Sequence, residues 1–333
     1  MICFYLVGIT SFLSLWAVKG ISVYDVLANF FFYSFLGWIY ESTLVSVRKR
    51  TLTNRGFLNG PIIPIYGFAA TFIYMAFYNE YAISLTEEVN ALHISEVFFF
   101  GMVIASILEY ITSYLMEKFF HAKWWDYSNY PLNIKGRISL PSSLFWGLLS
   151  TVMVYLIQPA VNNLLLQIPR PLGDYVLIAA VAAGSCDLIL TVAVTLKLNK
   201  KLEVLERLRE EVFEYTMGLK WYERREELKG RLTHSKVGEF AEELLGLVNK
   251  SYEKHLQRKV SEDSMERRKI RIDIEQRIKK FMELYNKSGN THLQKSIYKR
   301  MFKAFPNMKM VGKEGVFADF KDKIKKTSNR KKK

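Results

Sequence analysis

Five long apolar stretches constrain this chain more than any other feature of its sequence. They run over residues 23–47, 62–83, 94–117, 140–166 and 175–198. A helix needs about 20 mostly apolar residues to cross the roughly 30 Å of a bilayer's hydrocarbon core, and each stretch meets that length. A sixth apolar stretch, residues 1–18, has no charged side chain and lacks the basic start of a signal peptide. We therefore expect an extra N-terminal span within residues 1–20.

The charges divide the chain into two parts. Residues 1–198 carry equal numbers of basic and acidic side chains, so the net charge of +15 lies wholly in residues 199–333. An apolar, neutral part followed by a polar, basic part excludes a single soluble globular domain. The sequence therefore predicts an all-α fold, in which a polytopic membrane helix bundle of five to six spans, with its main body in residues 21–198, precedes a helical C-terminal domain.

The basic residues also alternate from loop to loop. Lys and Arg gather after the first, third and fifth stretches, whereas the loop after the second stretch has none and the loop after the fourth has only Arg170. Positively charged loops stay in the cytoplasm. We therefore expect a multi-pass protein of the cell membrane with both long basic loops and the C-terminal domain in the cytoplasm.

Three carboxylates lie inside the apolar stretches, where ionisable groups are costly. At a rise of 1.5 Å per residue, Glu41, Glu109 and Asp187 lie about 10–15 Å from the basic ends of stretches expected to run in the same direction. Small and hydroxyl-bearing residues recur beside each acid at steps of three and four, which predicts close helix packing. Three interpretations remain open: Arg55 and Arg137 fold back and pair with the acids, the acids form a pathway for protons or a cationic substrate, or each acid is bonded separately at helix contacts.

The two long basic loops are unusual for linkers. Residues 54–67 mix prolines and glycines with apolar residues, which predicts either a broken helix that lines a cavity or a tight turn before a kinked helix. Residues 124–137 hold paired tryptophans beside an acid and two bases, which predicts an interfacial platform or simple aromatic anchoring. The residues expected to contribute to a substrate or ion pathway, besides the three acids, are Asn54, Arg55, Tyr66, Trp125, Asp126, Asn133 and Arg137.

Several motifs in these stretches and loops resemble a known bacterial family. Residues 34–41 read SFLGWIYE, and NRGF at 54–57 is followed by Gly60-Pro61 and Tyr66-Gly67. The pattern continues with EYITS at 109–113, WWDYS at 124–128, and Asn133 with Gly136-Arg137. In this order, over roughly residues 25–198, they resemble the type IV ABC-transporter permeases. The resemblance implies a multi-span membrane protein that acts as a permease, and it implies no particular substrate.

The chain contains no phosphate-binding loop of the form Gly-x-x-x-x-Gly-Lys-Ser/Thr. If ATP drives this protein, a separate ATPase subunit has to bind the nucleotide. The sequence also has no compact catalytic motif and no metal-ligand spacing, so we expect neither a cofactor nor a bound metal.

Beyond residue 198, apolar residues recur at helical spacing in four segments: 205–222, 240–248, 270–281 and 293–301. We expect a cytoplasmic basic helical domain over residues 199–315 and a disordered polybasic tail over residues 316–333. Packing within one domain is favoured over a dimer seam, because the longest repeat covers only about two and a half heptads. The candidate partners are anionic lipids, a separate ATPase subunit and a second copy of the chain; nucleic acid has no motif behind it.

Three functions are consistent with these features. The leading one is a permease that moves a solute through a site lined by intramembrane carboxylates. The second is a membrane-embedded enzyme for lipid or isoprenoid head groups, with Glu41, Glu109 and Asp126 as acid, base or metal ligands. The third is a non-catalytic scaffold or sensor whose basic domain recruits partners.

Overall fold

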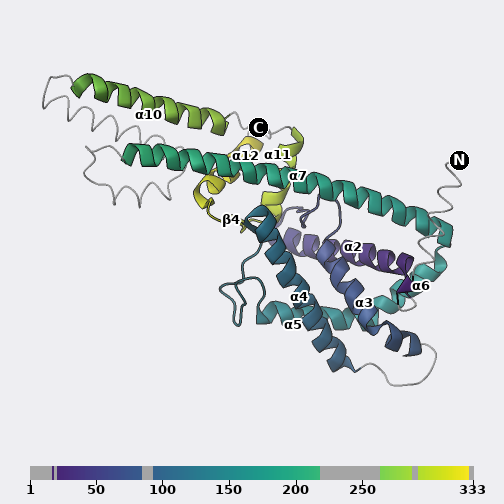
Figure 1. Cartoon of the computed structure of the whole chain (residues 1–333). Helices are drawn as coiled ribbons and strands as arrows, with labels where there is room; N and C mark the ends of the chain where they lie inside the picture. Colours follow the sequence, from purple (N-terminus) through teal and green to yellow (C-terminus); the bar gives the residue numbers. More distant parts are fainter. Residues whose placement is uncertain (1–16, 19–20, 85–92, 218–262, 287–291, 330–333) are drawn as a thin grey trace. The chain divides into compact units, whose positions relative to one another are not determined.

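The computed structural model describes residues 17–18, 21–84, 93–217, 263–286 and 292–329, and these residues are mostly helical (Figure 1). The extra span predicted within residues 1–20 lies outside the described residues, apart from two. Those two, Ala17–Val18, form the short strand β1, which pairs antiparallel with β2 (Ile21–Ser22).

Each of the five predicted apolar stretches is helical. The helices are α2 (Val23–Lys49), α3 (Pro64–Ser84), α4 (Ile94–Phe120), α5 (Leu140–Val152) with η1 (Met153–Ile157) and α6 (Gln158–Gln167), and α7 (Arg170–Met217). Among the described residues, three helical segments are long and apolar enough to cross a membrane: Ile94–Phe120, Leu140–Gln167 and Arg170–Arg207. Pro64–Phe77 is a shorter apolar helix. The composition of these helices is that of a membrane protein.

Two helix starts follow directly from local sequence. Ser22 precedes α2, and its hydroxyl accepts a hydrogen bond of 3.2 Å from the backbone N–H of Asp25. Ser139 and Ser142 form a reciprocal capping box at the start of α5, with Pro141 in the first turn. Side-chain oxygens at these positions satisfy N–H groups that have no partner within the helix, and proline has no N–H to satisfy.

The π-helical turn η1 interrupts the helix between α5 and α6. Pro159 lies in the first turn of α6, where it cannot donate a backbone hydrogen bond and its ring crowds the carbonyl of Tyr155. Regular α-helical bonding therefore cannot continue through this point, and one wider turn takes up the mismatch. The predicted stretch 140–166 is thus one helical path with a bulge.

The chain divides into two compact units. The first unit comprises Met1–Ala193 and Arg300–Met308, and the second comprises Val194–Lys299 and Lys309–Lys333. The helix α7 contributes residues to both. Sequence reasoning places a boundary at residue 198, but it contains no signal that residues 300–308 cluster with the apolar helices.

Small residues let the helices of the first unit approach closely. A Cβ added at Gly67 of α3 would overlap the Ser34 hydroxyl of α2, and one added at Gly37 of α2 would overlap the ring of Tyr66. A Cβ at Gly101 of α4 would overlap Ser150 of α5. Because lipid tails are as apolar as the helix surfaces, such close van der Waals packing, and not the hydrophobic effect, has to hold the helices together.

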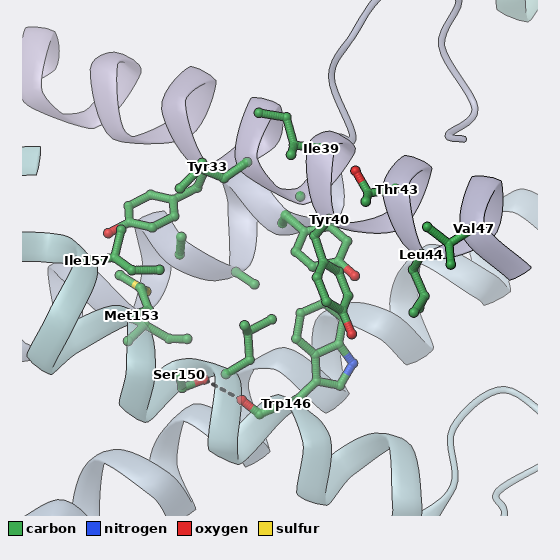
Figure 2. Close-up of a pocket in the computed structure, with 17 residues that line it drawn as sticks. Tyr33, Ile39, Tyr40, Thr43, Leu44, Val47, Trp146, Ser150, Met153 and Ile157 are labelled. Atoms are coloured by element: carbon green, nitrogen blue, oxygen red, sulfur yellow. Dashed lines mark hydrogen bonds between the residues drawn. The ribbon is translucent and has the colours of Figure 1, made fainter. Parts of the chain in front are cut away.

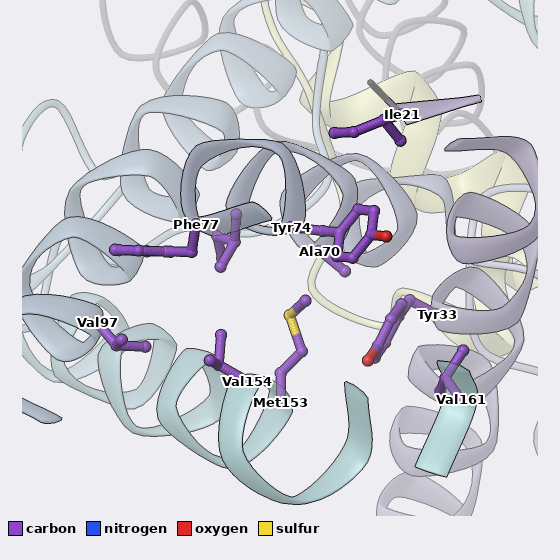
Figure 3. Packing of buried hydrophobic residues seen from close by; sticks show 10 residues of the cluster. Ile21, Tyr33, Ala70, Tyr74, Phe77, Val97, Met153, Val154 and Val161 are labelled. Atoms are coloured by element: carbon purple, nitrogen blue, oxygen red, sulfur yellow. The ribbon is translucent and has the colours of Figure 1, made fainter. Parts of the chain in front are cut away.

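The largest buried cluster of the first unit joins β2, α2, α3, α4, η1 and α6 (Figure 3). Its members are mainly aliphatic and aromatic side chains: Ile21, Tyr33, Ala70, Ile73, Tyr74, Phe77, Val97, Met153, Val154 and Val161. A series of hydrogen bonds between polar side chains borders the cluster. The Tyr33 hydroxyl donates to Gln158 Oε1 at 2.8 Å, and Gln158 Nε2 donates to Asn29 Oδ1 at 2.9 Å. The polar atoms buried here are thus bonded to one another.

The second unit contains the remainder of α7, α10 (Asp263–Asn286), the first part of α11 (His292–Ala304), β4 (Lys309–Met310) and α12 (Glu314–Asn329). The segment 240–248, for which a helix is predicted, lies outside the described residues. The tail predicted to be disordered from residue 316 is instead helical as far as Asn329. The reason is an apolar stripe at helical spacing, because Val316, Phe317 and Phe320 are all buried.

Candidate functional site

A cavity of about 340 Å³ lies within the first unit, at one end of its helices. We call it the carboxylate cavity. It is bordered by α2, α3, α4, α5 and α7, by the first loop (residues 50–63), by the second loop (residues 121–139) and by residue 305. The charged side chains among its described lining residues are Glu41, Arg55 and Glu109.

Glu41 is bound by a cation and by a hydroxyl. Arg55 Nε lies 2.9 Å from Glu41 Oε2, and the Tyr66 hydroxyl donates to Glu41 Oε1 at 3.0 Å. The backbone N–H of Arg55 donates to Ser42 Oγ at 3.0 Å, which places Arg55 beside α2. The predicted pairing of Arg55 with an intramembrane acid is thus present for Glu41.

Residues 300–308 complete the surroundings of Arg55. Its guanidinium lies 4.4 Å from the centroid of the Phe305 ring and donates a hydrogen bond to the carbonyl of Ala304. Trp124, from the second loop, packs edge-on against Phe305 with 5.0 Å between ring centroids. A cation over an aromatic face is attracted by the electrons of the ring, so Phe305 helps to hold Arg55 in this position.

Glu109 is bound differently. Its side chain is 5% exposed and accepts hydrogen bonds of 3.1 Å from the Tyr127 hydroxyl and 3.1 Å from Trp146 Nε1. Within the part of the chain that the structure describes, no Lys, Arg or His lies within ion-pair distance of Glu109. Burial, followed by the charge of Glu109, raises the pKa of Tyr127 well above its ordinary value, so this hydroxyl stays protonated and can donate.

Two aromatic residues connect the carboxylates. The rings of Tyr66 and Trp146 contact each other with 5.1 Å between their centroids. The hydroxyl of Tyr66 bonds to Glu41, and the indole N–H of Trp146 bonds to Glu109. Side chains from α2, α3, α5 and α4 therefore form one continuous contact path across the cavity.

Asp187, the third predicted acid, lies outside the lining of the carboxylate cavity. It accepts hydrogen bonds from the backbone N–H of Gly60 at 2.7 Å, from Asn59 Nδ2 at 2.8 Å and from the Thr191 hydroxyl at 3.1 Å. The structure thus brings two of the three acids into one cavity and uses the third to hold the first loop.

Asn54 also holds the first loop. Its Oδ1 accepts from Trp38 Nε1 at 2.7 Å, and its Nδ2 donates to the carbonyl of Asn59 at 2.7 Å. Asn54 is absent from the cavity lining, and its contacts position the first loop.

The predicted residues of the second loop separate into two sets. Trp125 lines the cavity, and its Nε1 donates to the carbonyl of Arg137 at 3.0 Å. Asp126 accepts from the Ser128 hydroxyl at 2.5 Å, and Asn133 accepts from the backbone N–H of Gly136 at 3.1 Å. These last two residues shape the loop and are absent from the cavity lining.

Arg137 does not pair with any of the three predicted acids. It lies 2.7 Å from Glu117 of α4 instead, a residue that is absent from the cavity lining. Burial alone lowers the pKa of Arg137, but the hydrogen bond and the charge of Glu117 raise it above its ordinary value. Glu117 was not predicted as a site residue, because it lies at the basic end of its stretch, where an acidic side chain is not unusual.

Arg300 is the functional-site residue that sequence reasoning missed most completely. It donates to the carbonyls of Gly56 and Phe57 at 2.9 and 2.6 Å and to Asn59 Oδ1 at 2.9 Å. Burial lowers its pKa to about 10, so it remains charged at neutral pH. No sequence pattern links Arg300 to a loop more than 200 residues earlier.

The described residues contain no group of three or more His, Cys, Asp or Glu side chains that could hold a metal ion. The arrangement therefore offers carboxylates, hydroxyls, indole N–H groups and aromatic faces to a ligand.

These features define a class of protein: a helical membrane protein with a carboxylate-lined cavity among its apolar helices. The family described as "Putative ABC-transporter type IV" matches residues 28–192. The resemblance predicted from the motifs is confirmed over these residues, which include Glu41, Glu109 and both loops. Residues 300–308 lie outside the match. No curated protein matches the chain, and no solved structure matches it.

Proposed function

We propose that this protein is the membrane-spanning permease subunit of a transporter and that it moves a positively charged solute through the carboxylate cavity. The family match and the apolar helices support the membrane location and the transporter class. The observation that carries the rest is Glu109, a buried carboxylate bonded by neutral donors in a cavity.

The charge balance of the cavity favours a cation. Arg55 pairs with Glu41, which leaves the Glu109 carboxyl group without a basic partner among the described lining residues. An ionised carboxylate at membrane depth is costly unless a partner or water meets it. A solute cation supplies that partner while it is bound.

The aromatic lining favours an organic cation over a bare metal ion. Eight of the 19 described lining residues are aromatic: Phe57, Tyr66, Phe120, Trp124, Trp125, Tyr127, Trp146 and Phe305. Aromatic faces attract ammonium groups and are poor ligands for hard metal ions, which require several oxygens.

The remaining parts of the proposal concern topology and partners. Because the chain has no phosphate-binding loop, a separate ATPase subunit would supply the energy. The alternation of basic loops supports a topology with both loops and the C-terminal domain in the cytoplasm, where the basic domain would attract anionic lipids at about 1 kcal/mol per Lys or Arg near the surface.

The enzyme alternative gains no support from the geometry. It requires Asp126 beside Glu41 and Glu109, whereas Asp126 bonds to Ser128 within the second loop and does not line the carboxylate cavity.

Flux through the reconstituted protein tests the proposal. Vesicles containing the full-length chain, with any ATPase subunit that co-purifies in mild detergent, are assayed with a panel of organic ammonium ions. We expect Glu109→Gln to lower the flux at least about tenfold, because the amide cannot neutralise the cation. Glu96→Gln is the matched control, since it makes the same change at an exposed residue of the same helix outside the cavity lining, and it should leave the flux unchanged. Equal flux in Glu109→Gln and the native chain, or no flux of any cation, would contradict the proposal.

A further inference from the structure

A second cavity, of about 590 Å³, lies between α2, α3 and the helical path of α5 and η1 (Figure 2). We call it the apolar groove. Tyr33, Met153 and Ile157 lie at one end, and Leu44 and Val47 lie at the other (Figure 2). Its volume falls in the range of about 300–1,000 Å³ that is typical of ligand pockets.

The apolar groove is open on the outer face of α2. Leu44 and Val47, which line it, are 55% and 72% exposed. Large aliphatic side chains exposed on a helix of a membrane bundle face lipid. The groove therefore opens toward lipid near the basic end of α2.

The apolar groove and the carboxylate cavity share a wall. Tyr66 and Trp146 line both of them. Each presents a ring to the groove, while its polar tip bonds to a carboxylate, Tyr66 to Glu41 and Trp146 to Glu109. An apolar compartment and a negatively charged compartment thus meet at one aromatic pair.

We propose that the ligand of this protein is an amphipathic cation, with an aliphatic chain in the apolar groove and an ammonium head in the carboxylate cavity. The inference rests on the proposed function for its cationic head and adds the chain and the lateral route. The two compartments match the two halves of such a molecule in polarity, and the charge of Glu109 complements the head.

The two compartments contribute differently to the binding of an amphipathic cation. Lipid tails are as apolar as the groove, so an aliphatic chain gains little free energy by moving from the lipid into it. The groove provides a route and a position. Discrimination comes from the head, because only a cation offsets the buried carboxylate.

Photolabelling tests the proposal directly. The full-length chain in an uncharged maltoside detergent is labelled with dodecyltrimethylammonium that carries a diazirine on its last carbon. We expect the label on groove residues of α2 and η1, and an excess of unlabelled dodecyltrimethylammonium should lower it at least about tenfold. Dodecanol, which has the chain without the charge, and tetramethylammonium, which has the charge without the chain, should each compete far less.

Variants separate the groove from the head site. Thr43→Trp and Leu44→Trp place an indole at the exposed mouth of the groove and should abolish the displaceable label, and Glu109→Gln should weaken it. Ile189→Trp is the matched control, because Ile189 is 69% exposed on α7 and lines neither cavity. Dodecanol competing as well as the cation, or labelling unaffected by both groove variants, would overturn the proposal.

The outcomes also distinguish this inference from the proposed function. If tetramethylammonium crosses vesicles in a manner that depends on Glu109 and not on Thr43 or Leu44, the transport proposal stands and the amphipathic ligand is refuted. If no cation is moved and no label is displaced, both are refuted.

Discussion

The two loops that border the carboxylate cavity are held in place in opposite ways. The backbone of the second loop (residues 121–139) is fastened by hydrogen bonds among its own residues, whereas the backbone of the first loop (residues 50–63) depends on side chains that come from distant parts of the chain. One loop is therefore a local motif, and the other is assembled by the fold.

Within the second loop, backbone hydrogen bonds join residues that are close in sequence. The N–H of Tyr127 bonds to the carbonyl of Gly136 at 2.8 Å, and the N–H of Ile134 bonds to the carbonyl of Ile138 at 3.0 Å. Gly136 has a φ of +68°, and an added Cβ would overlap Ser128 Oγ and Asp126 Oδ1. The glycine is thus required both for the backbone conformation and for the close approach.

In the first loop, an anionic side chain binds backbone N–H groups and a cationic side chain binds backbone carbonyl groups. The N–H of Gly60 points to Asp187, and the carbonyls of Gly56 and Phe57 point to Arg300. Asn59 connects the two charges, since its Nδ2 donates to Asp187 and its Oδ1 accepts from Arg300. A loop without regular secondary structure needs such partners for its buried polar groups.

The largest effect is expected from removing the anion that holds the first loop. Asp187→Ala leaves the amide groups of Asn59 and Gly60 without their charged acceptor, which should lower the free energy of unfolding by about 3 kcal/mol. Thermal unfolding in detergent measures the change, and trypsin cleavage after Arg55 should become faster. Asp187→Asn, which keeps the shape and one acceptor oxygen, should lose about half as much. A loss below about 0.5 kcal/mol with unchanged cleavage would show that the first loop does not depend on Asp187.

A smaller effect is expected from removing the cation. Arg300→Ala removes three hydrogen bonds to the first loop and should cost about 2 kcal/mol, while Arg300→Lys should recover only part, because an ammonium cannot reproduce the fork of donors. Lys299→Ala is the control, since Lys299 is an exposed cation on the same helix. If both alanine variants unfold alike, Arg300 does not stabilise the first loop.

The smallest effect is expected in the second loop. Gly136→Ala forces a side chain into a left-handed conformation beside two oxygens and should cost about 1–2 kcal/mol. Lys135→Gly, which relieves a neighbouring left-handed residue with a φ of 52°, should be neutral or slightly stabilising. Amide hydrogen exchange should increase within the second loop alone. Faster exchange in the first loop would contradict the contrast between the two loops.

Much of the fold could be predicted from local pattern. The apolar stretches predicted the positions of α2 to α7, because hydrocarbon admits only segments whose backbone groups bond within themselves. The small residues beside Glu41 correctly predicted close helix approach, since a Cβ added at Gly37 would overlap Tyr66. The continuity of α7 into the second unit was missed, although the segment from Tyr175 to Met217 holds one glycine and no proline to end the helix.

The candidate site could be predicted only in part. Its acids were found because a carboxylate inside an apolar stretch is costly wherever it occurs in a chain. Of their partners, Arg55 was among the candidates, but the others were missed. Arg137 bonds to Glu117 and Asp187 bonds to the first loop, and neither pairing leaves a trace in spacing or composition.

The difference between what could and could not be predicted from the sequence has a physical cause. Helix formation, capping and insertion into lipid depend on residues within a turn or two of each other, so the sequence determined which segments are helices and where charge lies within them. Which donor meets which carboxylate depends on helices brought together from across the chain. Only the tertiary structure could therefore decide that Glu41 is neutralised, that Glu109 is left with Tyr127 and Trp146, and that Arg300 holds the first loop.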